Sequence, residues 1–190
     1  MTPILGIMAS QISGHLTKIG YQSIATISVT SSTSSVEFTS IPSGFKHLQI
    51  RVLSNTNRTT YGTDSVKLNL NSDTGSNYSM HWLRGNGATA TGQGYATQTE
   101  IYLESISSTT VASNTFGVAV IDILDYTNTN KYKTVDCLSG VDINGTIATY
   151  GGFVYLTSGN WRNTNAVTSI KFTPDNNFQN YSSFALYGVS

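Results

Sequence analysis

The chain has 190 residues with ten basic and ten acidic side chains, so its formal net charge is zero, and only 11% of its residues are charged. A typical soluble domain is about 25% charged. No basic stripe is present, which argues against a nucleic-acid partner. The longest apolar runs have four residues, against about 20 for a membrane-spanning helix, so membrane insertion is not expected.

Residues 1–19 differ from the rest of the chain, because they are rich in aliphatic residues and poor in Ser and Thr. One interpretation is a first strand packed on the chain's own core. The other, which we favour, is a docking arm over residues 1–20 that binds a neighbouring subunit. Its contact residues are Ile4, Leu5, Ile7, Met8 and Ile12.

Residues 21–190 form a single domain of short strands, recognised by β-branched and aromatic residues that alternate with polar ones. The glycine-rich segment 85–94 is expected to be a loop, and the paired glycines Gly151 and Gly152 are expected to mark a bulge or a close backbone approach. The strands are expected near residues 24–29, 36–38, 47–52, 66–70, 78–83, 100–106, 116–126, 135–141, 151–156, 167–172 and 182–189.

The central hairpin, residues 116–141, has aliphatic residues on both faces of its first arm, as in a strand covered on both sides. On this basis Val118, Val120 and Leu124 are predicted to be buried. The predicted core around them consists of Leu48, Ile50, Val52, Leu68, Phe172 and Leu186. Strands at this spacing predict an all-β fold, an antiparallel β-sandwich of the jelly-roll type.

Cys137 is the only cysteine of the chain, so no disulfide can form within it. The alternation of its strand places Cys137 on the apolar face. It is expected to act as a small hydrophobe. No hydrolase or zinc motif surrounds His15, His47 or His81, so no catalytic residue is assigned and the chain is not expected to be an enzyme.

No cofactor or metal is expected. The segment Asn69–Gly75 has oxygen-rich side chains, but its glycine falls one position late for an EF-hand loop and position twelve is Met80 instead of Glu. An irregular calcium site around Asp73 is the alternative to a plain hairpin turn. Asp122 shares the predicted buried face of its strand, where a carboxylate needs a hydrogen-bond donor or a cation.

Aromatic residues bordered by amides and Arg are the composition of a sugar-binding surface, because the ring stacks on the sugar and the polar groups bind its hydroxyls. One candidate consists of Trp161, Arg162 and Asn163, and a second of Trp82 and Tyr95. The alternative for Trp161 is that it closes one end of the sandwich.

Several long segments resemble a family of virion structural proteins from phages of marine and freshwater bacteria. They are PILGIMASQISG, FTSIPSGFKHLQIR, NSDTGSNYSMHWLRGNG, FGVAVIDILDYTNTNKYKTV and TSIKFTPDNNFQNYSSFALYGV. The resemblance implies a structural protein on the exterior of a virion, of the capsid or the tail, with no catalytic residue to transfer.

A structural role in a virion implies two kinds of partner. One is further copies of the same chain, as a homotrimer, and the other is different virion proteins of the capsid or tail. The runner-up function is a carbohydrate-binding module that attaches the particle to a glycan of the host surface. In either case the protein is expected in the virion, after synthesis in the cytoplasm of the host bacterium.

Overall fold

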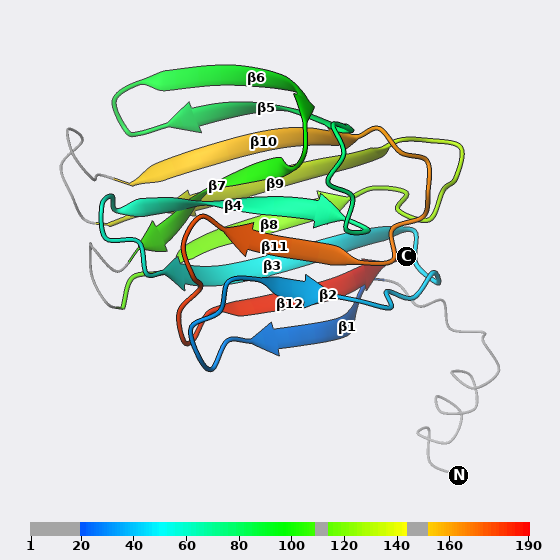
Figure 1. Cartoon of the computed structure of the whole chain (residues 1–190), viewed down its shortest axis with the longest axis horizontal. Coiled ribbons are helices and arrows are strands. Elements are labelled where there is room, and N and C mark those ends of the chain that lie inside the picture. The colour runs from blue at the N-terminus through cyan, green and yellow to red at the C-terminus, as the bar shows by residue number, and fades with distance from the viewer. Residues whose placement is uncertain (1–19, 109–113, 144–151) are drawn as a thin grey trace, which may run out of the picture.

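The computed structural model describes residues 20–108, 114–143 and 152–190, and every regular element in these ranges is a strand (Figure 1). The expected all-β class is therefore confirmed. Of the expected arm over residues 1–20, residues 1–19 lie outside the described residues. The strands are β1 (Tyr21–Ser28), β2 (Val36–Phe38), β3 (His47–Thr56), β4 (Thr63–Leu70), β5 (Tyr78–Gly85), β6 (Ala90–Gln98), β7 (Ile101–Ser108), β8 (Gly117–Ile123), β9 (Lys133–Val141), β10 (Phe153–Trp161), β11 (Ile170–Pro174) and β12 (Ser183–Val189).

Eight strands form one antiparallel array in the order β1-β12-β3-β8-β9-β10-β5-β6. Four others form a second antiparallel array in the order β2-β11-β4-β7. The two arrays join where Asn55 and Thr56 of β3 pair in parallel with Ser107 and Ser108 of β7. This junction makes the whole a single mixed sheet of twelve strands.

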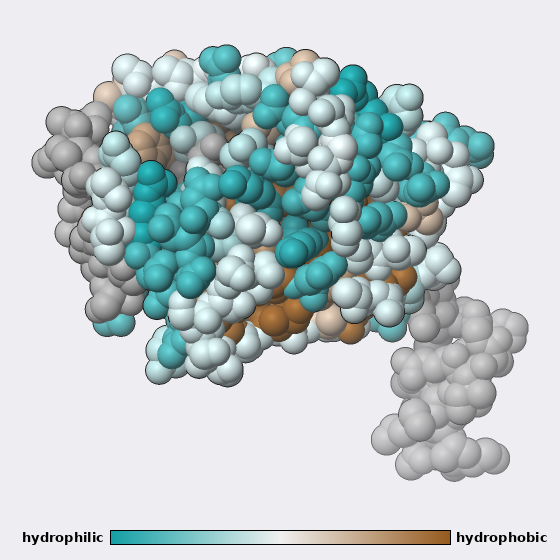
Figure 2. All heavy atoms as spheres, viewed as in Figure 1, coloured by the Kyte–Doolittle hydropathy of each residue, from teal (hydrophilic) through white to brown (hydrophobic). Residues whose placement is uncertain are grey.

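The four-stranded array lies across the middle of the eight-stranded one, and β5 and β6 extend past it (Figure 1). The core is between the two layers and draws residues from both. The six predicted core residues, Leu48, Ile50, Val52, Leu68, Phe172 and Leu186, are all buried there. The solvent side of the four-stranded array is mainly hydrophilic (Figure 2), and on it Lys67 pairs with Asp175 at 2.8 Å.

The predicted central hairpin is present as β8 and β9, but the prediction for the buried face of β8 is wrong. Val118, Val120 and Leu124 are 54, 39 and 41% exposed, and the buried residues are their neighbours, among them Ile121 and Ile123. Both faces of β8 are aliphatic, so alternation could not show which one meets the core, and a shift of one residue exchanges the faces.

Two further expectations about local structure can be compared with the strands. Residues 85–94 were expected to be a loop, but Gly85 ends β5 and the second half of the segment begins β6, which pairs with β5. The glycine at position 152 was expected to mark a bulge or a close backbone approach. It has φ of 91°, and a Cβ there would lie 2.4 Å from the carbonyl oxygen of Val141, so the close approach is confirmed.

Candidate functional site

Trp161, the first candidate for sugar stacking, lies in the core at the end of β10. Its side chain is 1% exposed and stacks on Tyr78, with ring centroids 6.4 Å apart. Its Nε1 donates a hydrogen bond of 2.8 Å to a carboxylate oxygen of Asp73. The expectation of a sugar platform at Trp161 is therefore wrong, since no face of the indole reaches solvent. The alternative, that the ring fastens one end of the core, agrees with these contacts.

The two residues after Trp161 hold the neighbouring loop. Nη2 of Arg162 donates to the carbonyl oxygen of Ser76 at 2.9 Å, and the side-chain oxygen of Asn163 accepts a hydrogen bond from the backbone of Asn165 at 2.9 Å. Without an accessible ring beside them, Arg162 and Asn163 have no sugar-stacking partner in this loop.

Asp73 is the centre of the turn between β4 and β5. Its carboxylate accepts hydrogen bonds from the backbone N–H of Gly75, the amide of Asn77 and the indole of Trp161. Burial acts to raise the pKa of Asp73, but these hydrogen bonds outweigh burial and hold the pKa below its ordinary value. The ionised form therefore stabilises the fold above the pKa of the unfolded chain, and this contribution is lost as the pH falls through the folded pKa.

The donors around Asp73 are N–H groups, which occupy the lone pairs that a calcium ion would need. Among the described residues, no three His, Cys, Asp or Glu side chains are grouped as metal ligands. We therefore expect a chelator to leave the melting temperature unchanged, because a metal that does not bind the folded state adds nothing to its stability. Differential scanning fluorimetry with and without EDTA measures this, and a drop of several degrees would contradict it.

Trp82 and Tyr95, the second sugar-binding candidate, lie on one face of the β5–β6 hairpin. Tyr95 is opposite Met80 in the register and Trp82 is opposite Gln93, so both rings are on the side of the sheet that carries the core. Because β5 and β6 extend past the four-stranded array, Trp82 is half-buried and Tyr95 is 40% exposed. The structure thus brings these two predicted residues together on an accessible surface.

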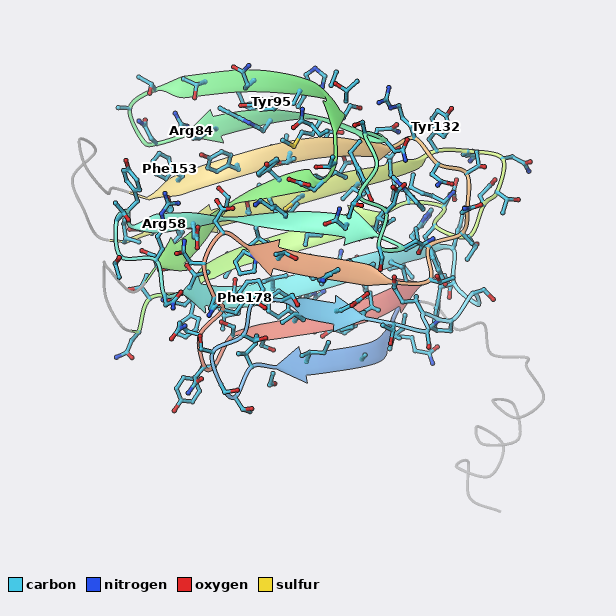
Figure 3. All side chains as sticks on the ribbon, viewed as in Figure 1. Arg58, Arg84, Tyr95, Tyr132, Phe153 and Phe178 are labelled. Carbon is cyan, nitrogen blue, oxygen red and sulfur yellow. The ribbon has the colours of Figure 1, made fainter. Side chains whose placement is uncertain are left out.

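Arg84 organises further aromatic residues beside Trp82, and sequence reasoning missed them. Its guanidinium lies 5.6 Å from the Trp82 ring, 5.2 Å from Phe153 and 5.9 Å from Tyr155, within the range of cation–π contacts. Figure 3 shows Arg84 beside Phe153 at the ends of β5 and β10, with Tyr95 on β6. We call Trp82, Arg84, Tyr95, Phe153 and Tyr155 the aromatic–arginine cluster.

The sequence contains a signal for only part of this cluster, the two residues on β5. Residues 82 and 84 alternate with the exposed Leu83, which places Trp82 and Arg84 on one strand face. Phe153 and Tyr155 join them only because β10 pairs with β5, where Tyr155 is opposite Arg84. That pairing spans about seventy residues and has no local signature.

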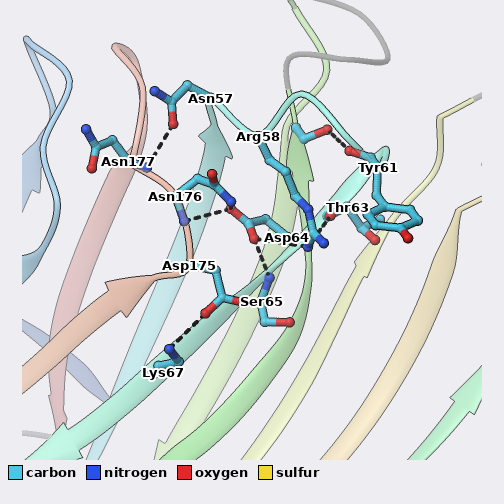
Figure 4. A network of polar contacts seen from close by, with 11 residues as sticks. Asn57, Arg58, Tyr61, Thr63, Asp64, Ser65, Lys67, Asp175, Asn176 and Asn177 are labelled. Atoms are coloured by element: carbon cyan, nitrogen blue, oxygen red, sulfur yellow. Dashed lines mark hydrogen bonds and ion pairs between the residues drawn. The ribbon is translucent and has the colours of Figure 1, made fainter.

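A second polar centre missed from the sequence is the buried carboxylate of Asp64 (Figure 4). It accepts hydrogen bonds from Nη1 of Arg58 at 3.3 Å, the backbone of Ser65 at 3.0 Å, and both the backbone and the side-chain amide of Asn176. These bonds tie the loop before β4 to the segment after β11, which is a structural role.

Lys133 is also buried, at the start of β9. Its ammonium group donates to the carbonyl oxygens of Asn128, Lys131 and Thr164, at 2.6 to 3.1 Å. Burial lowers the pKa of Lys133. The three bonds join the β8–β9 turn to the loop that follows Trp161.

His47, Cys137 and Asp122 have environments that the structure describes, whereas His15 lies outside the described residues. Nδ1 of His47 accepts a hydrogen bond from the backbone of Asp125 at 2.9 Å. Burial raises the pKa of the Cys137 thiol to about 12, so at neutral pH it is protonated and a poor nucleophile. Asp122, predicted on a buried face, lies on the outer face and accepts a hydrogen bond from Gln49 at 3.0 Å.

Comparison with known protein families, curated proteins and solved structures finds no match for this chain. In the part of the chain that the structure describes, no helix is long and apolar enough to cross a bilayer.

Proposed function

We propose that this chain is a non-enzymatic structural subunit on the exterior of a bacteriophage virion, as a capsid decoration, a head fibre or a tail-associated protein. The observation that carries the proposal is the strand order, which we interpret as a jelly roll with two inserted hairpins. Jelly rolls are frequent in viral capsid proteins and in lectins.

The jelly-roll interpretation rests on which strands pair. Setting aside β5–β6 and β9–β10, eight strands remain, and the first pairs with the last: β1 with β12, β2 with β11, β3 with β8 and β4 with β7. The pairs β12–β3 and β11–β4 complete two four-stranded layers. This pairing supports the interpretation of a long hairpin rolled into a sandwich. Both extra hairpins extend the same layer, beyond β8.

The composition supports an exposed structural role. A surface solubilised by hydroxyl and amide groups, with few charges, has little tendency to bind polyanions. The aliphatic residues 4–12 are the part of the sequence best suited to join this domain to neighbouring copies, as a homotrimer, or to other virion proteins. Resemblance to virion proteins points to the particle as the place where this occurs.

Deletion of residues 2–14 tests the proposal. We expect the truncated chain to remain folded and soluble but to be absent from particles. At about 25 cal/mol per Å², the four apolar side chains of the run Ile4, Leu5, Ile7 and Met8 alone contribute several kcal/mol to a contact before ordering costs. In an oligomer several N-terminal segments bind at once. After the first has bound, the others bind at a high effective concentration, so the overall affinity exceeds that of one segment. Incorporation is measured by immunoblotting of purified particles after complementation.

A matched control keeps the length of the segment and replaces Ile4, Leu5, Ile7, Met8 and Ile12 by Ser. It should fail to join particles in the same way, since the aliphatic side chains are the proposed contact. If the truncated chain fails to fold, the segment is a core strand and assembly through an arm is wrong.

A second candidate, carbohydrate binding for host attachment, is favoured by one observation, the accessible rings of Trp82 and Tyr95 in the aromatic–arginine cluster. Its rings offer apolar faces, and Gln93 and Thr91 border them with hydrogen-bonding groups. We expect Trp82→Ala to abolish binding on a glycan array while the fold is preserved. A wild-type chain that binds no glycan on an array of bacterial surface polysaccharides would remove this candidate.

A further inference from the structure

The outer face of the eight-stranded array, the side away from the core, carries a continuous apolar surface. Seven large aliphatic side chains on five neighbouring strands are exposed there, each by 39 to 59%. We call these residues the aliphatic stripe: Leu53, Leu83, Val118, Val120, Leu138, Val154 and Leu156.

The register places these side chains next to one another. Leu83 is opposite Leu156, Leu156 is opposite Leu138, and Leu138 is opposite Val120, so one row crosses four strands without a polar residue. A second row continues from Val154 through Gly140 to Val118 and Leu53. Side chains directly opposite have Cβ atoms about 5 Å apart, so both rows form one surface.

Charge is kept away from the stripe. Arg51 is opposite Val120, but its guanidinium lies over the rings of Tyr21 and Tyr187, at 5.5 and 5.2 Å, toward the β1 edge. The carboxylates of Asp122 and Asp136 lie one row beyond the stripe and form its polar border.

The area is sufficient for a specific contact. Seven aliphatic side chains exposed by about a half present on the order of 600 Å², at the upper end of the largest apolar patches on monomeric proteins. Two such faces in contact would bury on the order of 1,200 Å² from these side chains alone, the lower limit for a stable interface.

We propose that the aliphatic stripe binds the stripe of a second copy of this chain, sheet against sheet, in a two-fold contact. A two-fold interface brings the same patch of both subunits together, so the patch must be self-complementary. This patch meets that requirement, because its two rows contain no charged residue, so no like charges meet at its centre. Sheets packed face to face lie about 10 Å apart, the spacing that interdigitated Leu and Val side chains fill.

A recess lies at one end of the stripe and adds relief to the proposed contact surface. An open hollow of about 430 Å³ is lined in part by Val118, Gly140 and Val154. Gly140 carries no side chain between Val118 and Val154 in the second row, so the surface is lower there than at the neighbouring valines.

The inference goes beyond the proposed function, since it concerns a different surface from residues 1–19 and does not depend on the virion. Light scattering after size exclusion tests it on the full chain. The wild type is expected at an even multiple of the 20.4 kDa chain mass, two copies or six. Leu138→Lys, which puts a charge at the centre of the stripe, is expected to halve that mass.

Tyr132→Lys is the matched control. Tyr132 is 55% exposed, Leu138 is 56% exposed, and both changes add one positive charge, but Tyr132 lies in the β8–β9 turn, outside the stripe. It is expected to keep the wild-type mass. Circular dichroism checks that each variant is folded, and Leu156→Lys on β10 replaces Leu138→Lys if the latter is not.

Three results would overturn the proposal. One is a monomeric wild type throughout the micromolar range. Another is a folded stripe variant with the wild-type mass. In the third, deletion of residues 2–14 halves the mass measured by light scattering, whereas Leu138→Lys leaves it unchanged. That result would assign self-association to the N-terminal segment.

Discussion

Ile121→Asp is expected to unfold the protein, whereas the same substitution at the adjacent Val120 is expected to leave it folded. Ile121 is fully buried between the two layers, and Val120 is 39% exposed on the outer face. An unpaired carboxylate in the core costs several kcal/mol, a large part of the roughly 5–15 kcal/mol that stabilises a domain. At Val120 the carboxylate remains in contact with water.

The pair is internally controlled, because both substitutions introduce the same charge into the same strand one residue apart. Urea denaturation followed by far-UV circular dichroism gives the free energy of unfolding of each variant. We expect no folded baseline for Ile121→Asp and a loss of about 1 kcal/mol or less for Val120→Asp. If Val120→Asp were the variant that unfolds, the register of β8 would be shifted by one residue.

Trp161→Ala is expected to lower the free energy of unfolding by about 3–5 kcal/mol, the usual cost of emptying a buried aromatic site. Trp161→Phe keeps a ring but removes the N–H that donates to Asp73. Asp73 then keeps the N–H donors of Gly75 and Asn77. Only one hydrogen bond to a charged group is lost, which costs about 1.5–3 kcal/mol, so the loss should be smaller than for Trp161→Ala.

Trp82→Ala is the matched control, since Trp82 and Trp161 are the chain's only two tryptophans. Trp82 is half-buried and lies in edge-to-face contact with Tyr155, at 5.6 Å. Its removal should cost about 1 kcal/mol. Equal losses for Trp82→Ala and Trp161→Ala would show that Trp161 does not fasten the core.

Alternation identified the buried face wherever the opposite face is polar. In β3 the residues Leu48, Ile50 and Val52 alternate with His47, Gln49 and Arg51, and the prediction is confirmed. In β8 the outer face is also aliphatic, so the same rule gave the wrong face. Local alternation reports side-chain polarity, and it cannot distinguish a core from an uncovered apolar surface.

The candidate site could be predicted only in part. Trp82 and Tyr95 were chosen for their composition, and the β5–β6 register puts them on one face. Trp161 and Asp73 are 88 residues apart, and no local pattern signals their hydrogen bond. The burial of Trp161 therefore followed from strand pairing, which depends on the tertiary fold.

The most direct test of the proposed function is a cryo-electron microscopy map of the native particle in which this chain is made. We expect density for the two-layered domain on the outside of the capsid or tail. Neighbouring copies should meet there through the N-terminal segments. Purified particles that contain no such density, and no peptides of this chain by mass spectrometry, would contradict a structural role in the virion.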